Sequence, residues 1–134
     1  MYRPVRFLLA LLCLIALNAP LQAEEPVAVE PQYIELKPAF VGTIGPGPKI
    51  QYLKVDVALR VNEPAAVDKV KYHDPLIRNA LVGLFARQTR EALATLEGKE
   101  QLRAEALAAV RGVLEEEEGQ PLVDDLLFTN LITQ

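Results

Sequence analysis

YHDPLIRNALVGLFARQTREALATLEGKEQLR, residues 72–103, carries the strongest helix signals in the chain. Asp74 is predicted to be an N-cap, because its carboxylate can accept hydrogen bonds from backbone N–H groups. Pro75 then stands at the first helical position, where its missing N–H costs nothing. Apolar residues that are predicted to face inward follow at helical spacing, with Phe85 at the edge of their stripe. They are Leu76, Ile77, Ala80, Leu81 and Leu84.

A second apolar stripe begins after Gly98, which we interpret as an interruption between two helices. The first helix is expected to continue or bend near Thr89 and to carry on to Leu93 and Leu96. Arg103 falls among apolar positions and is predicted to snorkel or to pair with an acid from another segment. The second stripe consists of Leu102, Ala106, Ala109, Val110, Val113 and Leu114.

Two strands are predicted before these helices, and they are expected to form an antiparallel hairpin. Residues 33–41 form the first strand, and Pro38 places it at a sheet edge or a bulge because proline cannot donate to the ladder. Residues 42–48, GTIGPGP, are a dense turn signal. Residues 50–61 form the clearest strand, with one buried and one wet face. The buried face has Leu53, Val55, Val57, Leu59 and Val61, and the wet face has Lys54, Asp56, Ala58 and Arg60.

The rest of the chain adds a short helix and a last strand. Pro64 opens a helix after Asn62 or Glu63. Residues 115–118 are four acids that oppose the macrodipole at the end of the second long helix, so this end should fray in water. Residues 122–133 form a strand that is apolar on both faces, which suits a central strand or one covered by another subunit. The order β-β-α-α-α-β predicts an α+β fold, a small three-stranded sheet with three helices packed on it.

The beginning of the chain has the pattern of an export signal. Two arginines precede the apolar run of residues 7–17, which is too short to span a bilayer. Ala23 offers a small residue for cleavage, so residues 1–23 are predicted to be a signal peptide. The alternative is an uncleaved N-terminal anchor, because Leu21 is a large residue for the position where it would stand in a cleavage site.

Cleavage after residue 23 would leave a linker, residues 24–32, and one domain, residues 33–134. It would remove two arginines and the only cysteine, so the mature chain would be more acidic than the formal net charge of −4. An acidic surface disfavours nucleic acid, whose phosphates need basic partners, and it disfavours electrostatic binding to anionic lipid. Without cysteine the domain forms no disulfide, so its core alone must hold it together.

The residue types that catalysis needs are scarce. The predicted domain has no serine, no cysteine and a single histidine, His73, so a Ser–His or Cys–His pair is excluded. One histidine without cysteine cannot build a zinc site of the usual kind. His73 is interpreted as a solvated loop residue, and Asp124 and Asp125 should point to opposite faces of the last strand. We therefore predict a protein that is not an enzyme, with no catalytic, cofactor-binding or metal site.

The helix that begins at Asp74 has a second face that could meet a partner. Opposite the inward stripe, small side chains would let another helix or backbone come close. Alternatively, alanine and glycine are simply exposed there, as they often are on surface helices. The predicted subunit-contact face consists of Asn79, Val82, Gly83, Ala86 and Arg90.

Several short motifs follow one another from residue 33 to residue 134. They are Tyr33-x-x-Leu36 with Pro38 and Phe40, the alternating strand that ends at Val61, Asp74-Pro75-Leu76-Ile77-Arg78, Gln88-Thr89, Leu96-Glu97-Gly98-Lys99, Leu102-Arg103 and Leu127-Phe128-Thr129. Each motif is weak alone, but their order and spacing are fairly specific. Together they make a chain that resembles the FliL family of flagellar basal body-associated proteins.

The resemblance implies a stomatin-like (SPFH-like) periplasmic domain at the inner-membrane flagellar basal body. It also implies a homo-oligomeric ring around the motor stator units, support of flagellar rotation and swarming under load, and no enzymatic activity. Family members usually carry a transmembrane helix before this domain. Here membrane association would run through partners or through an uncleaved N-terminus. Two other interpretations stay open: a FliL-like scaffold of another inner-membrane complex, and a small periplasmic ligand-binding protein.

Overall fold

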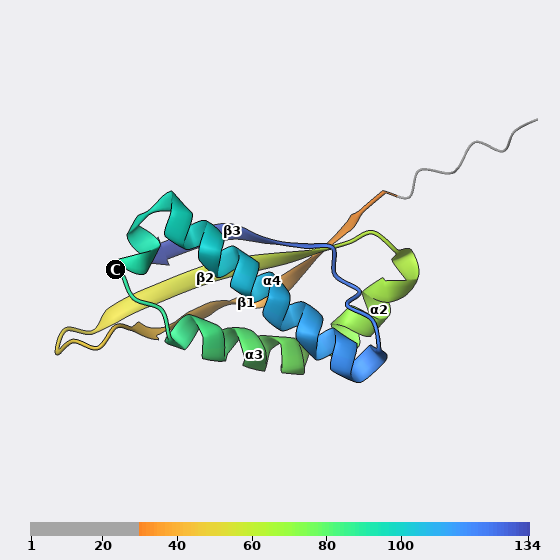
Figure 1. The fold of residues 1–134 in the computed structure, drawn as a ribbon, viewed down its shortest axis with the longest axis horizontal. Helices are drawn as coiled ribbons and strands as arrows, with labels where there is room; N and C mark the ends of the chain where they lie inside the picture. Colours follow the sequence, from red (N-terminus) through yellow and green to blue (C-terminus); the bar gives the residue numbers. More distant parts are fainter. Residues whose placement is uncertain (1–29) are drawn as a thin grey trace, which may run out of the picture.

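The computed structural model describes residues 30–134, which form an α+β domain (Figure 1). The predicted signal peptide or anchor, residues 1–23, and most of the predicted linker lie outside the described residues. Between residues 30 and 134, none of the helices has the length and apolar character needed to cross a membrane.

Three strands form one antiparallel sheet in the order β1-β2-β3. The chain follows the predicted order β-β-α-α-α-β, with one short 3-10 helix, η1, added, so the predicted fold class is confirmed. The elements are β1 (Gln32–Ile44), β2 (Gln51–Val61), α2 (Pro64–Tyr72), α3 (Asp74–Ala86), η1 (Ala92–Ala94), α4 (Leu96–Glu118) and β3 (Asp125–Thr133).

The core is built on one face of β2. The residues predicted to be buried there are at most 3% exposed: Leu53, Val55, Val57, Leu59 and Val61. Figure 1 shows α3 and α4 on the same side of the sheet, with α3 along β1 and α4 beside β3. Ala58 was expected to be wet but is buried, because it lies between Glu35 of β1 and Leu127 of β3. The rest of that opposite face is not covered by any helix of the described residues.

Both features predicted from Pro38 are present in β1. The strand lies at an edge of the sheet, and its register with β2 shifts between Leu36 and Phe40. The bulge lets the ladder continue on both sides of a residue that has no N–H to donate.

The turn predicted over residues 42–48 begins too early. β1 continues through Gly42 to Ile44, and Ile44 pairs with Gln51 of β2. Ile44 is buried in the core, and this burial outweighs the low strand propensity of Gly42.

β3 lies at the other edge of the sheet, so the prediction of a central strand is wrong. The strand begins at Asp125, and the N–H of the residue before it, Asp124, already donates a hydrogen bond to the Arg60 carbonyl of β2 at 2.9 Å. Leu126 is fully buried beneath α4, whereas Ile132 on the opposite face is 41% exposed. Cover of that face by another subunit stays a prediction.

The start and the face of α3 differ from the prediction. The helix begins at Asp74 and its N-cap is His73, so the predicted cap at Asp74 is wrong. His73 is also the C-cap of α2, which leaves no extended residue between the two helices. Leu76 is 45% exposed, because it is turned about 100° from Ile77 around the helix axis. The buried stripe is Ile77, Leu81, Leu84 and Phe85.

The connection between the two long helices also differs. α3 ends at Ala86 instead of continuing, and η1 inserts the buried Leu93 before α4 starts at Leu96. Gly98 therefore lies in the first turn of α4 and does not interrupt a pattern. The hydroxyl of Thr95 caps this turn by accepting a hydrogen bond from the Gly98 N–H at 3.0 Å.

We predict that Gly98→Ala lowers the free energy of unfolding by about 1–3 kcal/mol, because the new Cβ would collide with the Ala92 carbonyl and shift η1. Gly112→Ala is the matched control inside α4, since nothing lies within 4 Å of a Cβ placed there. That control should gain roughly 0.5–1 kcal/mol from helix propensity. Urea unfolding followed by circular dichroism measures both variants, and equal effects would contradict the role given to Gly98.

Candidate functional site

Most of the predicted contact face lies on the solvent side of α3. Asn79, Val82 and Ala86 are exposed, and Val82 is 54% exposed. Gly83 is half-buried, because a guanidinium group from the end of the helix lies over it. Arg90 lies beyond the end of α3, in the turn before η1, so its expected place on the helix face is wrong.

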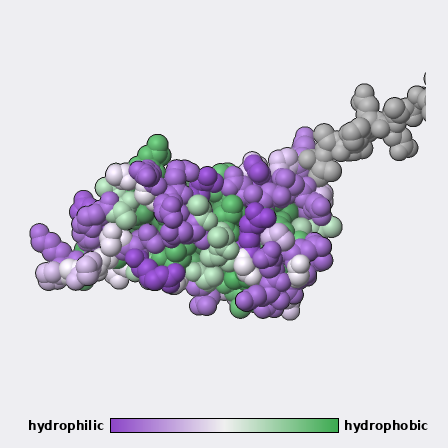
Figure 2. Space-filling model, viewed as in Figure 1, coloured by the Kyte–Doolittle hydropathy of each residue, from purple (hydrophilic) through white to green (hydrophobic). Residues whose placement is uncertain are grey.

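An apolar groove separates this face from β1. The helix side of the groove presents Val82 and Ala86, and the strand side is residues 41–44. Val41 is 70% exposed, and the groove has a volume of about 170 Å³. In the view of Figure 1, in which α3 and α4 lie in front of the sheet, apolar surface runs along the middle of the molecule among hydrophilic side chains (Figure 2). The lining residues are Val41, Gly42, Thr43, Ile44, Leu53, Val82, Phe85 and Ala86.

The strand side of the groove was missed by the sequence reasoning, because a turn was predicted to begin at Gly42. The available signal was the alternation of Phe40 and Ile44, two large apolar residues that share one face across Gly42. Both are buried, so the strand had to extend to the second of them.

Phe85 lines the groove and packs against the two edge strands. Its ring meets Phe40 of β1 edge to face, with ring centroids 5.2 Å apart, and Phe128 of β3 with centroids 6.1 Å apart. One helix residue therefore fixes the position of α3 against both edge strands. The sequence placed Phe85 only at the margin of the inward stripe, whereas it is buried.

Arg78 connects α3 to the bulged part of β1. Its Nη2 donates a hydrogen bond to the Pro38 carbonyl at 2.9 Å, and its guanidinium lies 4.3 Å from the centre of the Phe40 ring. Its Nη1 is buried and has no hydrogen-bond partner among residues 30–134. The bond to Pro38 covers one stretch of the β1 edge and leaves the stretch along the groove open.

His73 was predicted to be a solvated loop residue, and this prediction is wrong. It is 7% exposed instead of solvated, and its Nε2 lies 2.8 Å from Oε1 of Glu118 at the end of α4. Lys69 of α2 approaches the other oxygen of Glu118 at 3.9 Å. Glu118 therefore joins α4 to the junction of α2 and α3, and α4 stays helical through this residue rather than fraying earlier.

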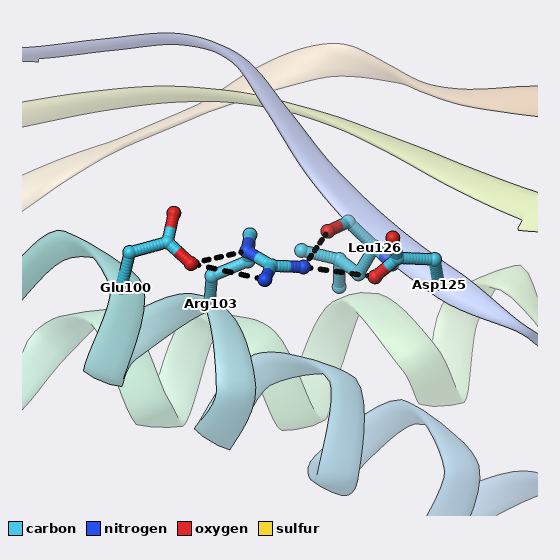
Figure 3. Close-up of polar contacts among 4 residues, drawn as sticks. All are labelled: Glu100, Arg103, Asp125 and Leu126. Atoms are coloured by element: carbon cyan, nitrogen blue, oxygen red, sulfur yellow. Dashed lines mark hydrogen bonds and ion pairs between the residues drawn. The ribbon is translucent and has the colours of Figure 1, made fainter.

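Arg103 pairs with an acid from another segment, as predicted (Figure 3). Its guanidinium donates to Asp125 of β3 at 2.9 Å, to the Leu126 carbonyl at 3.4 Å, and to Glu100 one turn earlier at 2.9 Å. The hydrogen bond to Glu100, with the charges of Glu100 and Asp125, raises the pKa of Arg103 above its ordinary value. The arginine thus ties α4 to the edge of β3.

The two adjacent aspartates have separate partners. Asp124 accepts a hydrogen bond from the backbone N–H of Asn62 at 2.8 Å, whereas Asp125 faces Arg103. They therefore bind in different directions and do not form a carboxylate pair. Within residues 30–134, no group of three or more acidic, histidine or cysteine side chains could hold a metal ion.

Fold and surface together define a class of protein: a small α+β domain with one open sheet face and an apolar groove beside an edge strand. The chain belongs to the FliL family. The family model described as "Flagellar basal body-associated protein FliL" matches residues 33–134, which is most of the chain.

Two relatives give the same family name. The flagellar protein FliL of Aquifex aeolicus (strain VF5) is 26% identical over 100 residues, which are 75% of this chain and 60% of that protein. The flagellar protein FliL of Escherichia coli (strain K12) is 29% identical over 111 residues, which are 83% of this chain and 70% of that protein. The aligned part thus spans about three-fifths of the Aquifex protein.

We predict that Glu118→Ala lowers the free energy of unfolding by about 1 kcal/mol, because it leaves His73 buried without a hydrogen-bond partner. Glu116→Ala is the matched control on the same helical turn, and Glu116 is exposed. That control should be neutral or slightly stabilising, since it removes an acid that opposes the helix dipole. Urea titrations compare the two, and a loss of stability in both would argue against a specific bond to His73.

Proposed function

We propose that this chain is a non-enzymatic protein of the flagellar basal body that scaffolds the motor stator units and supports rotation and swarming under load. The observation that carries the proposal is the extent of the family match. Residues 33–134 include every helix of the described domain, both faces of the sheet and the whole apolar groove. The surface features, rather than any cluster of reactive side chains, are what the domain offers to other molecules.

The proposed location is the periplasm, at the inner-membrane flagellar basal body. The support is the pattern of residues 1–23, in which a short apolar run follows two arginines and ends at a small residue. Attachment to the membrane would run through partners, or through the N-terminal segment if it is not cleaved. In either case the domain reaches its partners on the outer side of the inner membrane.

The proposed oligomer is a ring of identical copies that meet head to tail. A contact of this kind joins two different surfaces and closes into a ring when the rotation between copies allows it. The face of α3 is proposed as one of these surfaces, because Val82 and Ala86 expose apolar area beside the groove. The open sheet face adds exposed Tyr52 and Ile132. Without a partner, both regions would leave their apolar side chains exposed to water.

The dimensions of the groove suit a protein contact better than a drug-sized ligand at this place on the surface. Its volume of about 170 Å³ is below the roughly 300 Å³ at which sites for drug-sized ligands begin. Side chains or a short peptide segment fit such a groove better than an entire small molecule does.

We predict that deletion of the gene reduces swarming and swimming under high viscous load and leaves the growth rate unchanged. The physical reason is that stator units need more support when they deliver more torque. Swarm diameter and swimming speed in viscous medium measure the effect, and the wild-type gene should restore both. Unchanged motility under load, in a strain with no second FliL-like gene, would refute the proposed function.

We predict that Val82→Glu and Ala86→Glu each prevent assembly in cells without unfolding the domain. A buried charge at a subunit contact is costly, whereas neither side chain reaches the core. Ala104→Glu is the control, because Ala104 is exposed on α4 away from this face. Chemical cross-linking in cells reports the higher-order species. If both α3 variants assemble like the control, this face is not the subunit contact.

A further inference from the structure

The edge of β1 is open along the groove. β1 pairs only with β2 among the described residues, so alternate residues of the strand point their N–H and C=O groups away from the sheet. Near Pro38 the bulge and the bond from Arg78 occupy this edge. Over residues 41–44 it borders the apolar side chains of α3 instead. A groove between an edge strand and a helix accepts an extended segment that adds one more strand to the sheet.

We propose that residues 27–30 of a second copy dock in this groove as an added strand beside residues 41–44 of β1. The proposal rests on the self-association proposed above and names what covers the contact face. Backbone hydrogen bonds to β1 would fix the added segment, and its alternate side chains would pack on Val82 and Ala86 of α3.

The sequence before β1 has the right pattern and length. Val27-Ala28-Val29-Glu30 places two valines at a spacing of two, so both would point to the same side of an added strand. Pro26 and Pro31 flank the segment, and proline cannot donate to a ladder. Four residues are left between the prolines, and the strand side of the groove is also four residues long.

The charges of the segment and of the groove are also of opposite sign. Arg78 stands on α3 and Arg87 just after it, and the guanidinium of Arg87 lies back over Gly83. Neither forms an ion pair with an acid among residues 30–134. Glu25 and Glu30 flank the valines, and five residues of extended chain span roughly 17 Å. An added strand would therefore bring acidic side chains to a groove whose helix side, Val82 and Ala86, has an arginine before it and another after it.

The segment must come from another copy, because its own groove is out of reach. Val41 lies nine residues along β1 from Gln32, about 30 Å in an extended strand. Val29 precedes Gln32 by only three residues, which gives it a reach of about 10 Å. Donation to a neighbour is a head-to-tail contact: each copy offers its segment at one end and accepts another at the groove.

Cysteine pairing in the full chain tests the proposal. The native cysteine is first removed with Cys13→Ala, and Val29→Cys is then combined with Val82→Cys. Mild oxidation of intact cells should give disulfide-linked dimers and larger species on non-reducing gels. Each single variant, and the pair Val29→Cys with Ala104→Cys, should remain monomeric.

Three other results would overturn the proposal, and they can be told apart. A disulfide within one chain would mean that the segment folds back onto its own domain. No disulfide, while Val82→Glu still blocks assembly, would mean that the groove is a contact with a different occupant. Assembly that survives both Val82→Glu and Val29→Asp would remove the proposed self-association itself. Val29→Asp lies outside the described domain, so loss of assembly in that variant is not explained by a damaged core.

Discussion

A sheet of three strands with helices on a single face is the constraint on which the rest of this domain depends. The alternating side chains of β2 fill the space beneath α3 and α4, and each of them is almost completely excluded from water. Burying a large aliphatic side chain contributes about 1.5–3 kcal/mol, so this one strand supplies much of the driving force of a domain without disulfides. Because these helices pack on one face of the sheet, no helix among residues 30–134 is left to cover the opposite face. Within the described residues, one sheet face is therefore open to solvent, and β1 and β3 each pair with a strand on one side only.

Each edge strand accepts a hydrogen bond from an arginine of the neighbouring helix. Arg78 of α3 donates to the Pro38 carbonyl of β1, and Arg103 of α4 donates to the Leu126 carbonyl of β3. A free edge tends to pair with other chains, and charged groups on the edge suppress this tendency. Both arginines also bind the helix to its strand, so edge protection and packing of the two layers depend on the same side chains.

The sequence predicted correctly those features that depend on residues close together in the chain. The alternation of β2, the proline that opens α2, the bulge at Pro38 and the element order all follow from periodicity and backbone chemistry. The pairing of Arg103 with a distant acid followed from one charge in an apolar stripe. Positions that depend on contacts across the fold were predicted wrongly: His73 is buried, and its partner Glu118 lies 45 residues later in the chain. Likewise, apolar residues on both faces cannot distinguish a central strand from an edge strand, and β3 is an edge. For the contact face, helical spacing found Val82 and Ala86, whereas the strand side of the groove required the pairing of Ile44 with Gln51.

The open part of β1 along the groove is informative because an arginine binds the same strand a few residues earlier, at Pro38. A monomer would be expected to blunt residues 41–44 with a charge, a proline or a cover, as it does a few residues earlier at Pro38. Instead, small and apolar residues line this stretch, and the facing turns of α3 carry Val82 and Ala86 rather than an arginine like Arg78, which lies one turn before Val82. In a monomer, an open edge of this kind can pair with unrelated chains, whereas in an assembly the same edge can bind a specific partner. The shape of the domain therefore fits a protein that works as part of an assembly.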